Sequence, residues 1–172
     1  INPNANSHVV FYIPHQDDEA INFGGGIMNH IAGGHNVHVV LLTDGSSAVV
    51  RTQLGMTEYE FTQARNREFA YSLNILGVKP ENVSYRNLKD GSITVSQVET
   101  IIREFETKYP KAKHKAYSYT DWHNDHKNSG QALKNLQTAG VVTDARYYIR
   151  FGDNPIGITP IKEPFNPIYM NF

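Results

Sequence analysis

The sequence predicts an α/β domain, a Rossmann-like three-layer sandwich in which helices cover both faces of a mostly parallel sheet. Short strand-like segments alternate with helix-like segments, and the first two strand-like segments are apolar along almost their whole length. The helical connections are long enough for right-handed crossovers between parallel strands. A length of 172 residues suits one domain with a sizeable core. We therefore expect a single domain over residues 1–172, with an irregular wrapping tail over residues 155–172.

The strand-like segments are too short for helices and are rich in β-branched and aromatic residues. We expect strands over residues 8–13, 37–42, 83–88, 115–119 and 145–151. The carboxyl ends of parallel strands meet at one edge of a sheet, where open α/β folds bind their ligands. Polar and unusual residues follow the first, second and fourth of these segments, so we expect function at that edge.

The helix-like segments lie between the strands and carry their own start and stop signals. We expect helices over residues 19–32, 57–76, 96–109 and 128–138. Thr57 with Glu60, and Ser96 with Glu99, have the spacing of a capping box. The glycines at 24–26 lie about ten residues beyond the first strand without a GxGxxG pattern, which favours close helix–sheet packing or a kinked helix over a phosphate loop.

The composition excludes several classes of protein. The chain has no cysteine, which removes disulfides, thiolate zinc sites, iron–sulfur clusters and cysteine nucleophiles. Its 16 Lys and Arg against 17 Asp and Glu leave no basic excess for binding nucleic acid. No apolar stretch approaches the roughly 20 residues of a membrane span. A chain that begins with Ile1 and lacks cysteine fits a secreted or extracytoplasmic protein better than a cytoplasmic one, although trimming would also remove the Met.

The first polar cluster follows the first strand and consists of His15-Gln16-Asp17-Asp18-Glu19. Adjacent carboxylates repel one another, so such a cluster costs stability unless a cation or a helix start compensates. One interpretation is an ordinary helix N-terminus, since acidic residues are favoured in a first turn. The other is a metal site.

The second polar cluster follows the fourth strand and consists of Asp121-Trp122-His123-Asn124-Asp125-His126. Two histidines three residues apart share one side of a helical turn, but alone they are weak evidence for a metal. With the first cluster they supply two histidines and one carboxylate, namely His15, Asp18 and His126. Three protein ligands with open positions are typical of catalytic Zn²⁺ and also serve Fe²⁺.

The other histidines suggest no second site. His30, His35 and His38 surround a Gly-Gly turn, but they lie on different expected elements. His8 and His114 are expected at the surface.

The order of these motifs resembles the LmbE/PIG-L family of zinc-dependent deacetylases acting on N-acetylglucosamine derivatives. The resemblance extends over roughly residues 7–135. It rests on the two polar clusters and on weaker matches, which are Thr43-Asp44-Gly45, Arg65 with Glu68, Leu76-Gly77-Val78 and Asp90-Gly91. Gln16 departs from the family, which usually has proline there.

The resemblance implies a role for each matching residue. His15, Asp18 and His126 would bind the metal, which would be Zn²⁺ or another divalent ion such as Fe²⁺. Asp17 would be the general base, and His123 would stabilise the oxyanion or protonate the leaving amine. Those five residues would form the reacting centre.

Four further residues would surround the reacting centre. Asp125 could hold a ring N–H of a neighbouring histidine. Arg65 and Asp90 match positions that face the sugar, although Arg65 could instead pair with Glu68 or Asp44, and Asp90 also fits an ordinary Asp-Gly turn. Trp122 could offer a ring face to a sugar or belong to the core.

The implied activity is removal of an N-acetyl group from a small amino sugar, an oligosaccharide or a glycoconjugate. An amidase acting on another acylated amine would use the same residues. A carbohydrate-binding module could keep the metal without catalysis, although pure binding does not require Asp17 and His123. An oxygenase that uses Fe²⁺ on the same ligands would need a co-substrate and oxygen.

Overall fold

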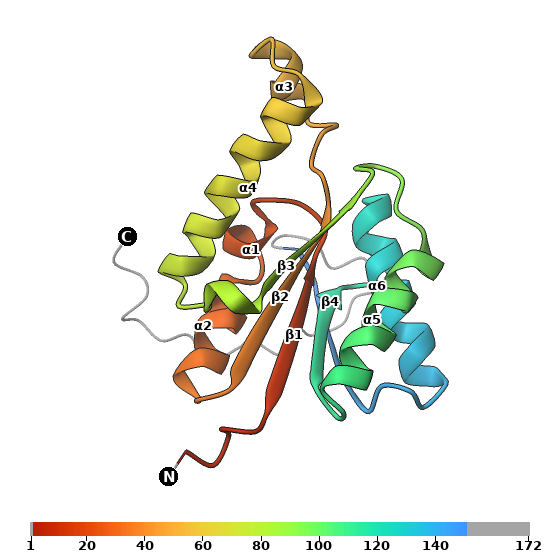
Figure 1. Ribbon diagram of the computed structural model, residues 1–172. Helices are drawn as coiled ribbons and strands as arrows, with labels where there is room; N and C mark the ends of the chain where they lie inside the picture. The colour runs from red at the N-terminus through yellow and green to blue at the C-terminus, as the bar shows by residue number, and fades with distance from the viewer. Residues whose placement is uncertain (1, 151–172) are drawn as a thin grey trace.

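The computed structural model describes residues 2–150, which form one five-stranded sheet with helices on both faces (Figure 1). The strands are β1 His8–Ile13, β2 Asn36–Thr43, β3 Val83–Leu88, β4 Lys113–Tyr117 and β5 Asp144–Tyr148. The helices are α1 Asp18–Ile21, α2 Gly24–Ala32, α3 Val49–Gln53, α4 Glu58–Ile75, the 3₁₀ turn η1 Pro80–Asn82, α5 Val95–Lys108 and α6 Asn124–Thr138.

The sheet has the order β3-β2-β1-β4-β5, and all of its strand pairs are parallel. The chain winds outward from β1 through β2 to β3, and then crosses back to place β4 on the other side of β1. The carboxyl ends of β1 and β4 therefore flank the point where the strand order reverses, which is the ligand-binding position of such folds. The α/β fold class predicted from the sequence is confirmed.

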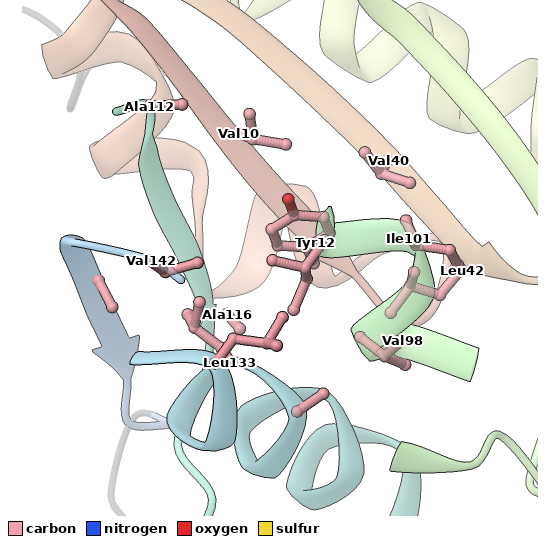
Figure 2. Packing of buried hydrophobic residues seen from close by; sticks show 14 of the residues in the cluster. Val10, Tyr12, Val40, Leu42, Val98, Ile101, Ala112, Ala116, Leu133 and Val142 are labelled. Atoms are coloured by element: carbon pink, nitrogen blue, oxygen red, sulfur yellow. The ribbon is translucent and has the colours of Figure 1, made fainter. Parts of the chain in front are cut away.

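Side chains alternate between the two faces of β1, and each face has its own apolar core. Val10 and Tyr12 pack against α5 and α6, next to residues such as Leu133 (Figure 2). Val9 and Phe11 face α2 and α4 in the second core. Because both faces of β1 are buried, the strand is an apolar and aromatic run from Val9 to Ile13, as its sequence indicated.

Several helix boundaries differ from the expected ones. The helix expected over residues 19–32 is two helices, with Asn22 and Phe23 between them. The capping box of α4 is confirmed, but α5 begins after Thr94, whose side chain and Gln97 form the box instead of Ser96 and Glu99. Two short elements, α3 and η1, were not expected.

The second half of the chain is shifted relative to the expected boundaries. Strand β4 is Lys113–Tyr117 and not 115–119, and α6 begins at Asn124, so the second polar cluster enters the helix. Strand β5 is Asp144–Tyr148, so it begins one residue before the expected strand over 145–151 and ends at Tyr148. Its expected end at residue 151 and the tail over 155–172 lie outside the described residues.

The glycines at the start of α2 allow close packing. A Cβ on Gly26 would lie 2.1 Å from the Tyr148 hydroxyl of β5, whereas one on Gly25 would meet nothing within 4 Å. Close helix–sheet packing therefore accounts for Gly26.

The expectation that His114 lies at the surface is wrong. Its side chain is fully buried, with one ring nitrogen 2.8 Å from the Tyr12 hydroxyl and the other 2.7 Å from Glu106. Within the described residues, no helix is both long enough and apolar enough to cross a bilayer.

Candidate metal centre

Three side chains from two strand ends converge at the switch point of the sheet. His15 follows β1, Asp18 opens α1, and His126 lies in the first turn of α6. Asp18 and His126 are each 5 % exposed, and the His15 side chain is 13 % exposed. The three residues are thus nearly buried but remain within reach of solvent at the sheet edge.

The three candidate ligand atoms form an almost regular triangle. His15 Nδ1 lies 3.4 Å from Asp18 Oδ2 and 3.3 Å from His126 Nε2, and Asp18 Oδ2 lies 3.5 Å from His126 Nε2. Neighbouring ligand atoms of a tetrahedral ion with bonds of about 2.0–2.1 Å lie roughly 3.3–3.4 Å apart. The donor set and its spacing therefore fit one face of a tetrahedral Zn²⁺ shell.

The far side of the His15 ring is held by carboxylates. His15 Nε2 lies 3.0 Å from Asp125 Oδ2 and 3.2 Å from Asp90 Oδ1. Asp125 is fully buried and also accepts the backbone N–H groups of Gly91 and Ile93. A proton on Nε2 would leave the Nδ1 lone pair free for a metal, which is the common arrangement of metal-binding histidines.

Two residues to which the sequence analysis gave no role contact the other candidate ligands. Asp121 Oδ2 lies 3.4 Å from His126 Nδ1, the ring nitrogen opposite the ligand atom. The Tyr117 hydroxyl donates to Asp18 Oδ1 at 2.6 Å. Asp121 opens the second polar cluster and could have been suspected, whereas Tyr117 has the sequence signature of an ordinary strand residue.

Asp17 precedes the candidate ligand Asp18 in the chain, and 58 % of its side chain is exposed. Its backbone has φ 124° and ψ −30°, an unfavourable conformation for a residue with a Cβ. The Asp17 N–H donates to Glu19 Oε2 at 2.8 Å, and the Arg65 guanidinium lies 3.1 Å from Asp17 Oδ2. Arg65 also donates to the Gln16 carbonyl, so it pairs with neither Glu68 nor Asp44 here.

His123 caps α6 with its ring. His123 Nδ1 accepts the backbone N–H of Asp125, so a proton on the neutral ring resides on Nε2. Burial, together with the neighbouring His126 and His15, lowers the pKa of His123. The ring is therefore neutral near pH 7 and carries one N–H that can be donated.

The structure places Trp122 at the surface and brings Asp90 to the candidate centre. Trp122 is 69 % exposed beside His123 and stacks with Arg150, so it does not belong to the core. Asp90 does turn the chain before Gly91, but its carboxylate also reaches His15 and accepts the Ser47 N–H.

Carboxylates dominate the electrostatics of the centre. Burial opposes a charge on His15, but Asp125, Asp18 and Asp90 outweigh it and raise the pKa of His15 to about 11. Burial also opposes a charge on Asp18, yet His126 and His15 hold its pKa well below the usual range. The histidines thus supply positive charge that a divalent cation could supply instead.

Other groupings of metal-binding side chains overlap with this one. His15 lies with His123 and His126, and also with Asp90 and Asp125, in groups whose ligand atoms fall within 4.8 Å. We favour the set containing Asp18 because its three separations match one coordination shell. His38 contacts His8 and Tyr109 instead of His30 or His35.

Residues 10–137 match the family described as PIG-L: GlcNAc-PI de-N-acetylase. The chain belongs to the PIG-L family. This match spans all of the residues that converge at the centre.

Solved structures share the fold with this PIG-L family member. The N,N'-diacetylchitobiose deacetylase of Pyrococcus horikoshii has a TM-score of 0.66 and 23 % identity, over 80 % of this chain and 53 % of that one. The zinc-inhibited form of the teicoplanin deacetylase Orf2 has a TM-score of 0.64 and 17 % identity, over 79 % and 65 %. GalB, the 4-carboxy-2-hydroxymuconate hydratase of Pseudomonas putida KT2440, has a TM-score of 0.66 and 20 % identity, over 77 % and 56 %.

The chain thus spans between about half and two thirds of the length of these solved relatives. No curated protein matches the sequence. Since a hydratase shares the fold with deacetylases, the reaction has to be argued from the site.

Proposed function

We propose that this PIG-L family member is a metal-dependent N-deacetylase that removes the acetyl group from an N-acetylglucosamine-containing sugar or glycoconjugate. The observation that carries the proposal is the triangle of His15 Nδ1, Asp18 Oδ2 and His126 Nε2, with its edges of 3.3–3.5 Å. The ligand types favour Zn²⁺, with Fe²⁺ as the other candidate. When bound, the metal would supply Lewis acidity for hydrolysis of the amide.

The chain's own residues supply the proton transfers. Asp17 is exposed, anchored by Arg65 and adjacent to Asp18, so its carboxylate can accept a proton from the attacking water. His123 is neutral and can donate its Nε2 proton to the developing oxyanion or to the leaving amine. A module that only binds sugar would not need this pair.

The substrate contacts of the proposal lie around these groups. The exposed ring of Trp122 offers a face on which the C–H groups of a sugar can pack. The Arg65 and Asp90 side chains are 15 % and 9 % exposed and are already bonded within the centre. Their proposed contact with the sugar would therefore use the few polar atoms left at the surface.

The decisive experiment combines metal analysis with an assay of acetate release. We expect the purified protein to bind one Zn²⁺ and to release acetate from N-acetylglucosamine or N,N'-diacetylchitobiose. Chelation should abolish acetate release, and added Zn²⁺ should restore it. Binding of these sugars without acetate release would instead support the carbohydrate-binding alternative, and release of another acyl group alone would support the amidase.

A further inference from the structure

Tyr117 touches two of the three proposed metal ligands at once. It is the last residue of β4 and is fully buried. Its ring lies parallel to the His126 ring, with 3.9 Å between the centroids and 2° between the planes. The rings of Phe23 and Tyr117 form an edge-to-face pair, with 4.7 Å between their centroids. The His126 ring therefore rests on a fixed aromatic surface.

The hydroxyl of Tyr117 has a defined hydrogen-bond direction. It lies 2.6 Å from Asp18 Oδ1 and 2.6 Å from Asn22 Nδ2. An amide nitrogen can only donate, and an ionised carboxylate can only accept. The proton of the Tyr117 hydroxyl must therefore point to Asp18, while Asn22 donates to the hydroxyl oxygen.

This hydrogen bond gives the two carboxylate oxygens of Asp18 different partners. Oδ1 is engaged by Tyr117, whereas Oδ2 faces His15 Nδ1 and His126 Nε2 and accepts the backbone N–H of His15. A carboxylate fixed in this way presents one oxygen to a cation. Without the hydroxyl, the carboxylate could rotate or offer both oxygens.

We propose that Tyr117 is a positioning residue that makes Asp18 a single-oxygen metal ligand and fixes the plane of the His126 ring. The inference rests on the proposed function, because it assumes that these ligands hold a metal. It adds a residue outside the two polar clusters, contributed by β4, the strand that precedes the second cluster. Asn22 extends the arrangement by one bond, since it orients the hydroxyl.

The test replaces Tyr117 with phenylalanine and compares the metal affinities of the apo proteins. Tyr117→Phe keeps the ring on His126 and removes only the hydroxyl. We expect Zn²⁺ affinity, measured by competition with a chromophoric chelator, to fall about 10- to 100-fold, as is typical when a partner of a metal ligand is removed. The visible spectrum of the Co²⁺-loaded protein should also change, because it reports the number and geometry of the ligand atoms.

Tyr12→Phe is the matched control. Tyr12 is equally buried, donates to or accepts from His114 at 2.8 Å, and lies on the opposite face of the sheet. The substitution Tyr12→Phe removes a buried hydroxyl that contacts no proposed ligand. We therefore expect the Zn²⁺ affinity and the Co²⁺ spectrum to stay as in the wild type. Equal affinities and spectra for Tyr117→Phe and Tyr12→Phe would overturn the inference.

A second variant guards against misfolding of the first. Asn22→Ala leaves Tyr117 and Asp18 in place but releases the hydroxyl, so we expect a smaller loss of affinity with the same spectral change. If neither variant alters Co²⁺ coordination while the wild type binds the ion, the inference fails and the proposed function stands. If the wild type itself binds neither Zn²⁺ nor Co²⁺, the proposed function fails first.

Discussion

Arg65 Nη2 lies 3.1 Å from Asp17 Oδ2 and joins the long helix α4 to the loop after β1. The same guanidinium donates to the backbone carbonyl of Gln16, so Arg65 binds both a backbone group and the Asp17 side chain of this loop. The Glu19 carboxylate accepts a hydrogen bond from the backbone N–H of Asp17. The strained backbone of Asp17 is therefore fixed by contacts that also aim its carboxylate.

Asp17→Asn tests the role of that carboxylate as the proton acceptor. The amide keeps the size of the side chain but cannot take a proton from water. We expect acetate release to fall by about 10²- to 10⁴-fold, the usual contribution of a general base, with fold and metal content unchanged. Turnover numbers and metal analysis on the same preparation check this, and wild-type turnover in the variant would refute the mechanism.

Arg65→Gln tests whether kcat depends on the orientation of the Asp17 carboxylate. The variant removes the ion pair while leaving Asp17 and the proposed metal ligands in place. We expect kcat to fall by up to roughly 10²-fold, since small misplacements of a reacting group have effects of that size. Metal affinity should change little.

Arg67→Gln is the matched control for Arg65→Gln. Arg67 lies on the same helix α4 but is exposed. We expect its kcat to equal that of the wild type. A similar kcat for both variants would show that the Arg65 ion pair does not orient Asp17 for the reaction.

The sequence predicted the proposed ligands because they depend on local patterns. His15 and Asp18 follow an apolar strand directly, and His126 follows another strand of the same parallel sheet. Parallel pairing alone brings those strand ends to one edge. Sequence patterns could not predict contacts between side chains of different helices and strands. Tyr117 reaches Asp18 because β4 pairs with β1, which brings the end of β4 next to the residues that follow β1. No spacing in the chain records that contact.

Physical causes also explain the element boundaries and the histidine burial that the sequence predicted wrongly. Two overlapping capping boxes were available for α5, and the structure uses the one that begins at Thr94. The start of β4 could not be read from its alternating lysines, and it is set by pairing of Lys113 with Val9 of β1. His114 was expected outside because it is polar, but Tyr12 and Glu106 satisfy its ring nitrogens in the interior.

Gly130→Ala is expected to disturb both stability and the metal centre. A Cβ at Gly130 would lie 2.3 Å from the Tyr117 carbonyl oxygen and 2.4 Å from the Tyr119 nitrogen. These are backbone atoms, so α6 would have to move away from the end of β4, and His126 would move with it. We expect a loss of about 1–3 kcal/mol in the free energy of unfolding, as in other overpacked sites, together with weaker Zn²⁺ binding.

Gly25→Ala provides the contrast for that substitution. A Cβ at Gly25 meets nothing within 4 Å, and the residue lies inside α2. We expect a neutral effect or a gain of up to about 1 kcal/mol from the higher helix propensity of alanine. Denaturant unfolding of both apo variants measures the difference. Equal stabilities would contradict the close approach of α6 to β4.

His38→Gln tests the pH dependence of stability at the end of the sheet away from the metal centre. His38 is 5 % exposed and lies 2.9 Å from His8 of β1, with Tyr109 stacked on its ring. Burial, His8 and Lys108 lower the pKa of His38 to about 4. The side chain is therefore neutral in the folded protein at pH values where the unfolded chain, with a histidine pKa of about 6.5, already binds a proton.

Between pH 6.5 and pH 4 the unfolded state thus binds more protons at this position, so acidification favours unfolding. We expect the wild type to lose about 1–2 kcal/mol between pH 7 and pH 5 through His38 alone. His38→Gln keeps a polar group near His8 but does not titrate, so its stability should fall less over the same interval. Unfolding curves of both proteins at pH 5, 6 and 7 measure that difference. A pH dependence in His38→Gln as steep as that of the wild type would mean that His38 already ionises in the folded protein at its usual pKa.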